Sequence, residues 1–258
     1  MIKTFITPPN NYLELTEKGT GGFYCLGQIY KKNEKYREYA LEAKRQGRFI
    51  ILDSGVGDHG KPLSNRELFE IAKELRPNEI IPLDNLYNCE QTIKNCAEMA
   101  QWLKDFGLAD EVKILMCPQG DTLQEWLKCY EFAMLNPAVS TTGLSKKTIP
   151  HILFDAKPDE MIAESRHMIY DILKYKGWLQ KPIHLLGSAG TEEYEYYEND
   201  PIIRSTDSCV AVWMGMNLKS VIYSDRIPTP ADYFERSITN SAMEIVRNNI
   251  YLFNRELA

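Results

Sequence analysis

Three aspartates each stand at the end of a short apolar segment of the chain. Asp53 closes "RFIILD", Asp84 closes "EIIPLD" and Asp207 closes "IIRSTD". In a parallel barrel the carboxyl ends of all strands meet at one face, so side chains that are distant in sequence come together there. A single acid in such a place is equally well explained as a helix N-cap. Three of them together indicate a functional site.

Carboxylates gathered in one site can take different chemical roles. A general acid/base needs a perturbed pKa, a nucleophile must stay ionised, and a recognition acid accepts hydrogen bonds from the N–H groups of a ligand. Two carboxylates on either side of a reacting sugar carbon are the usual arrangement for breaking a glycosidic bond with retention. The residues permit this chemistry without naming a substrate.

Alternating apolar and amphipathic segments supply the elements that must position these acids. A capping box, Ser64 with Glu67, begins a helix predicted over 64–75. Other helices are predicted over 96–106, 123–135, 161–175 and 242–252. Strands are predicted within 23–29, 48–53, 79–84, 112–117, 138–144, 183–187, 202–207 and 219–224.

This alternation predicts an α/β fold, a single (β/α)8 TIM barrel that takes in residues 1–258 as one domain. A doubly wound open sheet is the alternative, but no glycine-rich phosphate loop follows the first predicted strand. The segment 148–158 fits neither a strand nor a helix, and we expect it to be a long loop that covers the site.

Composition and charge limit the function classes. The chain has 258 residues, of which 44% are hydrophobic and 26% charged, and a net charge of −6, which argues against broad affinity for phosphate. A basic run at 31–48 and an acidic, aromatic run at 190–200 are both interpreted as exposed helices. Six cysteines and four histidines show no ligand spacing, so we expect no metal and no cofactor. The apolar runs are too short to cross a membrane and no secretory signal begins the chain, which favours a cytoplasmic protein without membrane contact.

Six motifs in order resemble those of the tRNA-guanine transglycosylase superfamily, whose members are (β/α)8 barrels. They are "ILDSGVGDHG", "IIPLDNLYNCEQTI", "MCPQGDT", "TTGLSKK", "IHLLGSAG" and "STDSC". Together they cover roughly residues 48–216, and each lies at a predicted strand end.

The resemblance implies a role for each aspartate. Asp207 matches the nucleophile that attacks C1′ of the sugar and expels guanine, leaving a covalent glycosyl-enzyme. Asp53, followed by Ser54 in the same motif, matches the acid/base for the leaving and incoming bases. Asp84 matches the acid that accepts hydrogen bonds from the Watson–Crick edge of the base.

The resemblance also implies a set of base contacts. They are Gln119 and Gly120 at the base oxygen, Gly143 and Leu144 at the far edge, and Leu186 with Gly187 on one face. Glycine at 120 and 143 would let the backbone come close to a flat ligand. The family's aromatic residue after Asp-Ser-Gly is missing, and His59 is either its replacement or an ordinary loop histidine.

The chain departs from the tRNA enzymes in lacking their CxCxxC…His zinc site, which argues against tRNA as the substrate. It is similar to the compact relatives in bacterial modification systems and phages that exchange guanine in DNA for a 7-deazaguanine such as preQ0 or preQ1. Three alternatives remain: a zinc-free tRNA enzyme, a non-catalytic nucleic-acid-binding subunit, and a barrel that acts on a small nucleoside. The C-terminal helix either closes the barrel or forms a homodimer face.

Overall fold

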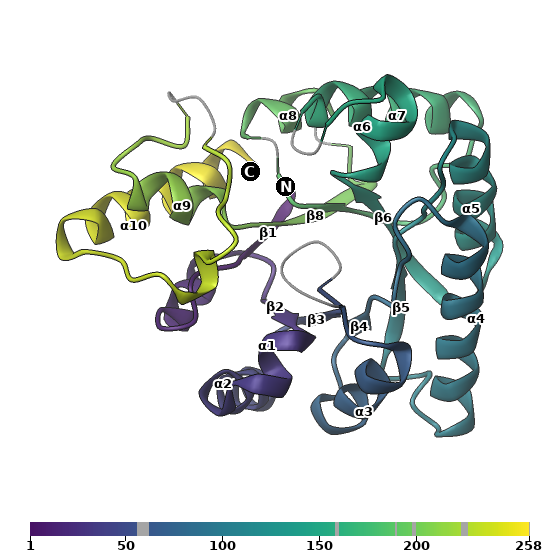
Figure 1. Cartoon of the computed structure of the whole chain (residues 1–258), viewed down its shortest axis with the longest axis horizontal. Helices are drawn as coiled ribbons and strands as arrows, with labels where there is room; N and C mark the ends of the chain where they lie inside the picture. The colour runs from purple at the N-terminus through teal and green to yellow at the C-terminus, as the bar shows by residue number, and fades with distance from the viewer. Residues whose placement is uncertain (56–61, 158–159, 189, 198–199, 223–226, 258) are drawn as a thin grey trace.

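A computed structural model shows one sheet of eight parallel strands in the order β1-β8-β7-β6-β5-β4-β3-β2, with helices around it. Figure 1 shows the strands as a ring with the helices outside. The chain is therefore a nearly closed (β/α)8 barrel, as the sequence predicts. The structure describes residues 1–55, 62–157, 160–188, 190–197, 200–222 and 227–257.

Seven of the eight predicted strands are confirmed. The eighth is wrong: the described residues at 219–222 form no strand, because the side-chain amide of Asn249 bonds the backbone of Lys219 (2.8 Å) and Val221 (3.2 Å). The eighth strand of the barrel is instead the four-residue segment Lys3–Ile6, just before two prolines. The sequence analysis overlooked it. The strands are β1 Lys3–Ile6, β2 Phe23–Leu26, β3 Ile50–Asp53, β4 Glu79–Ile80, β5 Lys113–Met116, β6 Val139–Ser145, β7 Ile183–Leu186 and β8 Ile203–Ser208.

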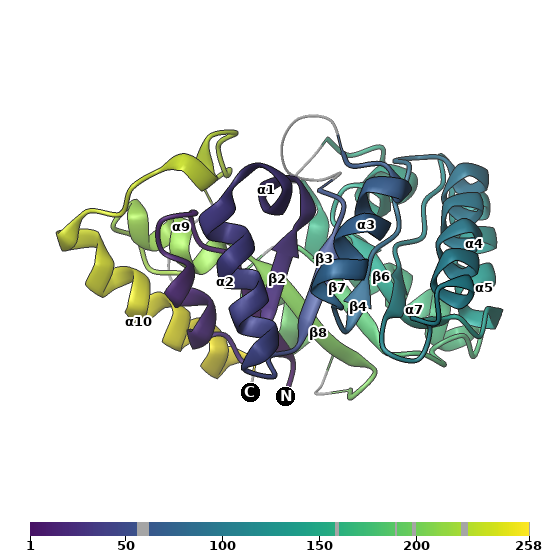
Figure 2. The same cartoon turned by 90° about the horizontal axis from the view of Figure 1, so that it is seen from below.

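Side-chain caps begin most of the long helices. Ser64 and Glu67 form the predicted capping box, and Asn88, Thr122 and Thr239 each accept a hydrogen bond from the first turn that follows. The helices are α1 Gly27–Lys32, α2 Glu34–Arg45, α3 Asn65–Leu75, α4 Cys89–Asp105, α5 Leu123–Leu135, α6 Thr148–Phe154, α7 Ile162–Tyr175, α8 Glu192–Glu195, α9 Val210–Met216 and α10 Asn240–Glu256, with 3₁₀ turns η1 Leu13–Lys18 and η2 Tyr233–Glu235. Figure 2 shows α10 at one end of the molecule and α4 and α5 at the other, with the strands between them.

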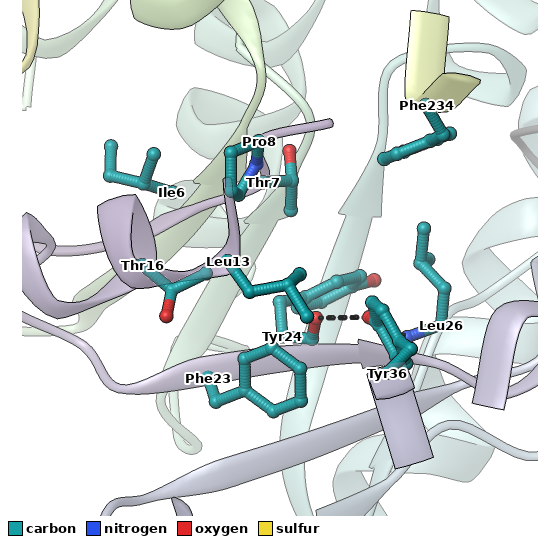
Figure 3. Close-up of a pocket in the computed structure, with 10 residues that line it drawn as sticks. All are labelled: Ile6, Thr7, Pro8, Leu13, Thr16, Phe23, Tyr24, Leu26, Tyr36 and Phe234. Carbon is teal, nitrogen blue, oxygen red and sulfur yellow. Dashed lines mark hydrogen bonds between the residues drawn. The ribbon is translucent and has the colours of Figure 1, made fainter. Parts of the chain in front are cut away.

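The barrel has a seam between β1 and β2, which are neighbours in the ring but are not paired as strands. One backbone bond crosses it, from the Gly21 N–H to the Thr4 carbonyl (2.8 Å), and the rings of Phe5 and Tyr24 meet edge to face at 6.4 Å. A small, mainly apolar pocket lies at this seam (Figure 3), where the Tyr36 hydroxyl donates to the Tyr24 carbonyl. The pocket is lined by Ile6, Thr7, Pro8, Leu13, Thr16, Phe23, Tyr24, Leu26, Tyr36 and Phe234.

Two β-bulges bring extra polar groups into the barrel interior. The register of β5 with β6 shifts so that Ser140 and Thr141 both donate to Glu79, and that of β7 with β8 shifts beside Arg204. Arg204 then forms a two-pronged pair with Glu79, at 2.7 Å for each contact. Burial pushes the pKa of Glu79 upward, but the charge and hydrogen bonds of Arg204 outweigh it and hold that pKa below its ordinary value. Bulges of this kind re-aim side chains next to functional sites.

The acidic, aromatic run at 190–200 is not the exposed helix that the sequence indicated. Only one helical turn, α8, forms there, and Glu193, Tyr194 and Tyr197 are buried in the described part of the run. Glu193 is buried because it pairs with the equally buried Arg166. Among the described residues, no helix has both the length and the apolar character needed to cross a membrane.

Candidate active site

The three aspartates lie at the carboxyl ends of their strands. Asp53 is the last residue of β3, Asp84 follows β4, and Asp207 is the next-to-last residue of β8. The charges of Asp53 and Asp84 both act on the buried Cys117 thiol after β5, and together with burial they raise its pKa. The structure therefore brings Asp53 and Asp84 to one region, and Asp207 ends its strand on the same face of the barrel.

Asp84 is buried and accepts a hydrogen bond from a side-chain amide. Its carboxylate accepts a hydrogen bond from Gln119 Nε2 at 2.6 Å, and the Thr148 hydroxyl donates to Gln119 Oε1. Gln119 and Thr148 have no exposed surface. Burial raises the pKa of Asp84 to about 6, although the hydrogen bond from Gln119 lowers it. Asp84 is thus ionised at neutral pH, but protonation needs only mild acid.

Asp207 lies in a setting rich in hydrogen-bond donors. Its Oδ1 accepts from the Gly187 N–H at 2.9 Å and lies 3.2 Å from His184 Nε2, and its side chain is 17% exposed. Gly187 has φ of +70°, which favours glycine. A Cβ there would also come within 2.6 Å of the Lys146 side chain. Gly187, which was predicted to contact the base, thus donates its backbone N–H to the predicted nucleophile.

His184 is a site residue that the sequence analysis missed. It is fully buried inside the barrel, its ring stacked on Tyr24 (5.9 Å between centroids, 11° between planes), and its Nδ1 lies 2.8 Å from Ser205 Oγ. The available signal was its position in "IHLLG", two residues before Leu186 and so on the same face of the strand.

Arg166 is a second missed residue. It is fully buried on α7 and donates to the carbonyls of Leu144 (2.7 Å), Leu186 and Gly187 (2.8 Å), and to Glu193 (2.9 Å). A single guanidinium therefore holds together the ends of β6 and β7, where four predicted base contacts lie. The signal was a charged residue on the apolar stripe of α7.

Gly120 and Gly143, at which the backbone was predicted to approach a base, are closely packed against neighbouring protein atoms. A Cβ on Gly120 would lie 2.4 Å from the Trp126 backbone nitrogen, in the first turn of α5. A Cβ on Gly143 would lie 2.5 Å from the Leu186 side chain. Both positions need glycine for internal packing, which is a sufficient reason for the residue at each.

Two further predicted site residues have different outcomes. Ser54 is fully buried directly after Asp53, and among the described residues its hydroxyl has no hydrogen-bond partner. His59 lies outside the described residues.

The segment 148–158 is not the long loop that was expected. Its first seven residues form α6, and Pro150 falls in the first turn, where a helix tolerates proline. His151 of this helix lies 3.2 Å from Asp121, and its ring packs against Tyr87 at 4.5 Å. These three residues follow β6, β5 and β4, so they lie at the same end of the barrel as the aspartates.

Among the described residues, no group of three or more His, Cys, Asp or Glu side chains is arranged to hold a metal ion. Comparison of the chain with family models and with curated proteins finds no match. The function must therefore be argued from the site itself.

Proposed function

We propose that this protein is a DNA guanine transglycosylase that exchanges guanine for a 7-deazaguanine base, such as preQ0 or preQ1, in the cytoplasm. The observation that carries the proposal is the pair of contrasting carboxylates at one end of the barrel. Asp84 is buried beside an amide, whereas Asp207 is held by donors at the edge of solvent. A base exchange by double displacement needs one acid to bind the base and another to attack the sugar.

In the first step Asp207 acts as the nucleophile. A carboxylate oxygen forms a bond to C1′ as the C1′–N9 bond breaks, and the electron pair leaves with guanine. Asp53 delivers the proton that the departing base takes up. The sugar is then held as an ester of Asp207, which keeps the free energy of the glycosidic bond, so that no nucleoside triphosphate is needed.

The second step reverses the first with a different base. The incoming 7-deazaguanine loses its N9 proton to Asp53 as N9 attacks C1′, and Asp207 leaves as a carboxylate. Asp53 thus ends in the protonation state in which it began, and no oxidant or co-reactant is consumed.

Base recognition falls to Asp84 and Gln119. Ionised Asp84 accepts hydrogen bonds from the N–H groups on the Watson–Crick edge of guanine, which 7-deazaguanine shares. Gln119 is fixed between Asp84 and Thr148, so its amide is already oriented before a base arrives.

DNA is favoured over tRNA because the chain has no cysteine–histidine spacing for the zinc subdomain of the tRNA enzymes. The target nucleotide in DNA would have to be unpaired or turned out of the helix. Two lysines at this end of the barrel favour the binding of a polyanion such as DNA. Lys146 packs over Gly187, and the charge of Lys147 acts on Asp84.

The test is nucleoside mass spectrometry on DNA and on tRNA, each incubated with the protein and a panel of 7-deazaguanine bases. We expect 7-deazaguanine in DNA only, and none with Asp207→Asn. Incorporation into tRNA alone would replace the substrate and keep the chemistry. No incorporation into either polymer by folded protein would contradict the proposal and favour a binding subunit or a nucleoside enzyme.

A further inference from the structure

A chain of polar contacts leads to Asp207 through the middle of the barrel. It runs from Glu79 to Arg204 (2.7 Å), from Arg204 Nε to Ser205 Oγ (3.2 Å), from Ser205 to His184 Nδ1 (2.8 Å) and from His184 Nε2 to Asp207 Oδ1 (3.2 Å). The bulge in β8 makes it continuous, because neighbouring residues 204 and 205 both take part in it. Its last member is the predicted nucleophile.

The donors and acceptors in this chain limit where the protons can lie. A guanidinium can only donate, so Ser205 Oγ accepts from Arg204. The single hydroxyl proton of Ser205 is then free to point at His184 Nδ1, which accepts it in a neutral ring. The ring proton must in that case lie on Nε2, where it is donated to Asp207 Oδ1.

Packing holds the ring in this orientation. His184 has no exposed surface, it is stacked on Tyr24, and the edge of Phe5 approaches it with centroids 6.0 Å apart. A ring flip would place Cδ2 and Cε1 where Nδ1 and Nε2 now lie and would lose both hydrogen bonds. The imidazole is therefore a preorganised donor rather than a mobile one.

We propose that His184 is a positioning residue that, together with the Gly187 N–H, occupies Asp207 Oδ1 and leaves Oδ2 as the oxygen that attacks C1′. The catalytic part of this inference rests on the proposed function. When Oδ2 bonds to C1′ and the C1′–N9 bond breaks, Oδ1 becomes the carbonyl oxygen of the ester and keeps both donors. No proton moves through His184, which acts only through the orientation and charge of Asp207.

The first test is independent of turnover. Long-range ¹H–¹⁵N spectra of the histidine rings in the wild-type protein, with His184→Gln used to assign the signal, report which ring nitrogen carries the proton. We expect a neutral ring protonated at Nε2. A neutral ring protonated at Nδ1 only, which has no Nε2 proton to donate to Asp207, would overturn the inference whether or not the protein exchanges bases.

The second test compares two substitutions of similar length. The His184→Gln amide reaches the Nε2 position and can donate to Asp207, whereas His184→Met fills the space without a donor. With DNA and a 7-deazaguanine, we expect His184→Met to lower kcat by roughly 10- to 100-fold with little change in KM for the base, and His184→Gln to restore most of it. Circular dichroism melts of both variants establish that they are folded.

The outcomes separate the two claims. If the wild type exchanges bases and the Met and Gln variants are equally active or equally impaired, the positioning role is wrong and the proposed function stands. If the wild type exchanges no base in any polymer, the proposed function and the catalytic part of the inference both fail. The imidazole spectra still decide whether Nε2 donates to Asp207.

Discussion

Asp84 and Asp207 are the same residue type near the ends of two parallel strands, yet the fold surrounds them differently. Asp84 is buried with Gln119 as its side-chain amide partner, and burial raises its pKa to about 6. Asp207 keeps 17% of its side chain exposed and receives a backbone N–H and an imidazole on one oxygen. Burial thus makes Asp84 costly to ionise, whereas Asp207 has hydrogen-bond donors beside one of its oxygens.

The difference shows that strand position brings acids together but does not assign their roles. The environment of Asp84 comes from β5 and α6, which supply Gln119 and Thr148. That of Asp207 comes from β7, which supplies His184 and Gly187. A desolvated acid suits recognition of a donor-bearing base edge, and a solvated, hydrogen-bonded acid suits attack on a sugar carbon.

The largest effect is expected from Asp207→Asn. The amide keeps an oxygen that can accept from Gly187 but is no longer a nucleophile, so base exchange should fall by roughly 10³-fold or more with the melting temperature nearly unchanged. Mass spectrometry of the modified DNA measures it, with the exposed Asp110→Asn as the control. Activity within a few-fold of wild type would remove Asp207 from the chemistry.

Arg166→Met tests whether Arg166 stabilises the fold by holding the ends of β6 and β7, which lie on the Asp207 side of the site. It removes the guanidinium that pairs with the fully buried Glu193 and donates to the Leu144 and Gly187 carbonyls, so we expect the free energy of unfolding to fall by about 3–5 kcal/mol. Urea denaturation measures this. The matched control is Arg37→Met, whose exposed pair with Glu74 should contribute little, so the free energy of unfolding should stay nearly unchanged. Equal losses in the two variants would contradict the role given to Arg166.

We expect Asp84→Asn to raise the free energy of unfolding at neutral and higher pH, because the buried, ionised Asp84 destabilises the folded protein. Because the pKa of Asp84 is higher in the folded protein than in the unfolded chain, the carboxyl ionises first in the unfolded chain as pH rises. The free energy of unfolding therefore falls between about pH 4 and pH 6 and stays at the lower value at pH 8. The variant should be more stable than wild type by roughly 3 kcal/mol at pH 8 and about equal to it near pH 4. Urea denaturation at both pH values measures this, with the exposed Asp121→Asn as the control. A variant that is less stable at pH 8 would contradict the assignment of burial as the dominant effect on Asp84.

The same pKa predicts how base binding depends on pH. Below about pH 6 the Asp84 carboxyl is protonated and loses an acceptor for the base edge, so affinity for 7-deazaguanine should fall about tenfold for each further unit. Calorimetric titration from pH 5 to 8 measures it. Affinity that is unchanged across this range would separate Asp84 from base recognition.

The smallest effect is expected from Lys146→Ala at the end of the barrel. If its ammonium group meets a DNA phosphate, the slope of log affinity against log salt concentration should become shallower by about 0.9. Lys104→Ala, in the last turn of α4, is the control and should leave the slope unchanged. Equal slopes for the two variants would exclude Lys146 from phosphate contact.

The sequence predicted the barrel and the strand-end acids because both depend on local patterns. Asp53, Asp84 and Asp207 each end an apolar run that is visible in the chain. It could not predict the partners that distinguish them, since His184 and Gln119 meet their aspartates only through the pairing of neighbouring strands, β7 with β8 and β4 with β5. The missed strand β1 has the same cause: four residues carry little periodicity, and Lys3–Ile6 is identified only by its pairing with β8.

The most direct test of the central claim is to capture the covalent intermediate. The protein is mixed with a guanine-containing DNA oligonucleotide without an incoming base, quenched in acid and analysed by intact-protein and peptide mass spectrometry. We predict an adduct with the mass of the oligonucleotide minus guanine, on the peptide that contains Asp207. An adduct on Asp53, or base exchange that proceeds with no adduct on any carboxylate, would contradict the account.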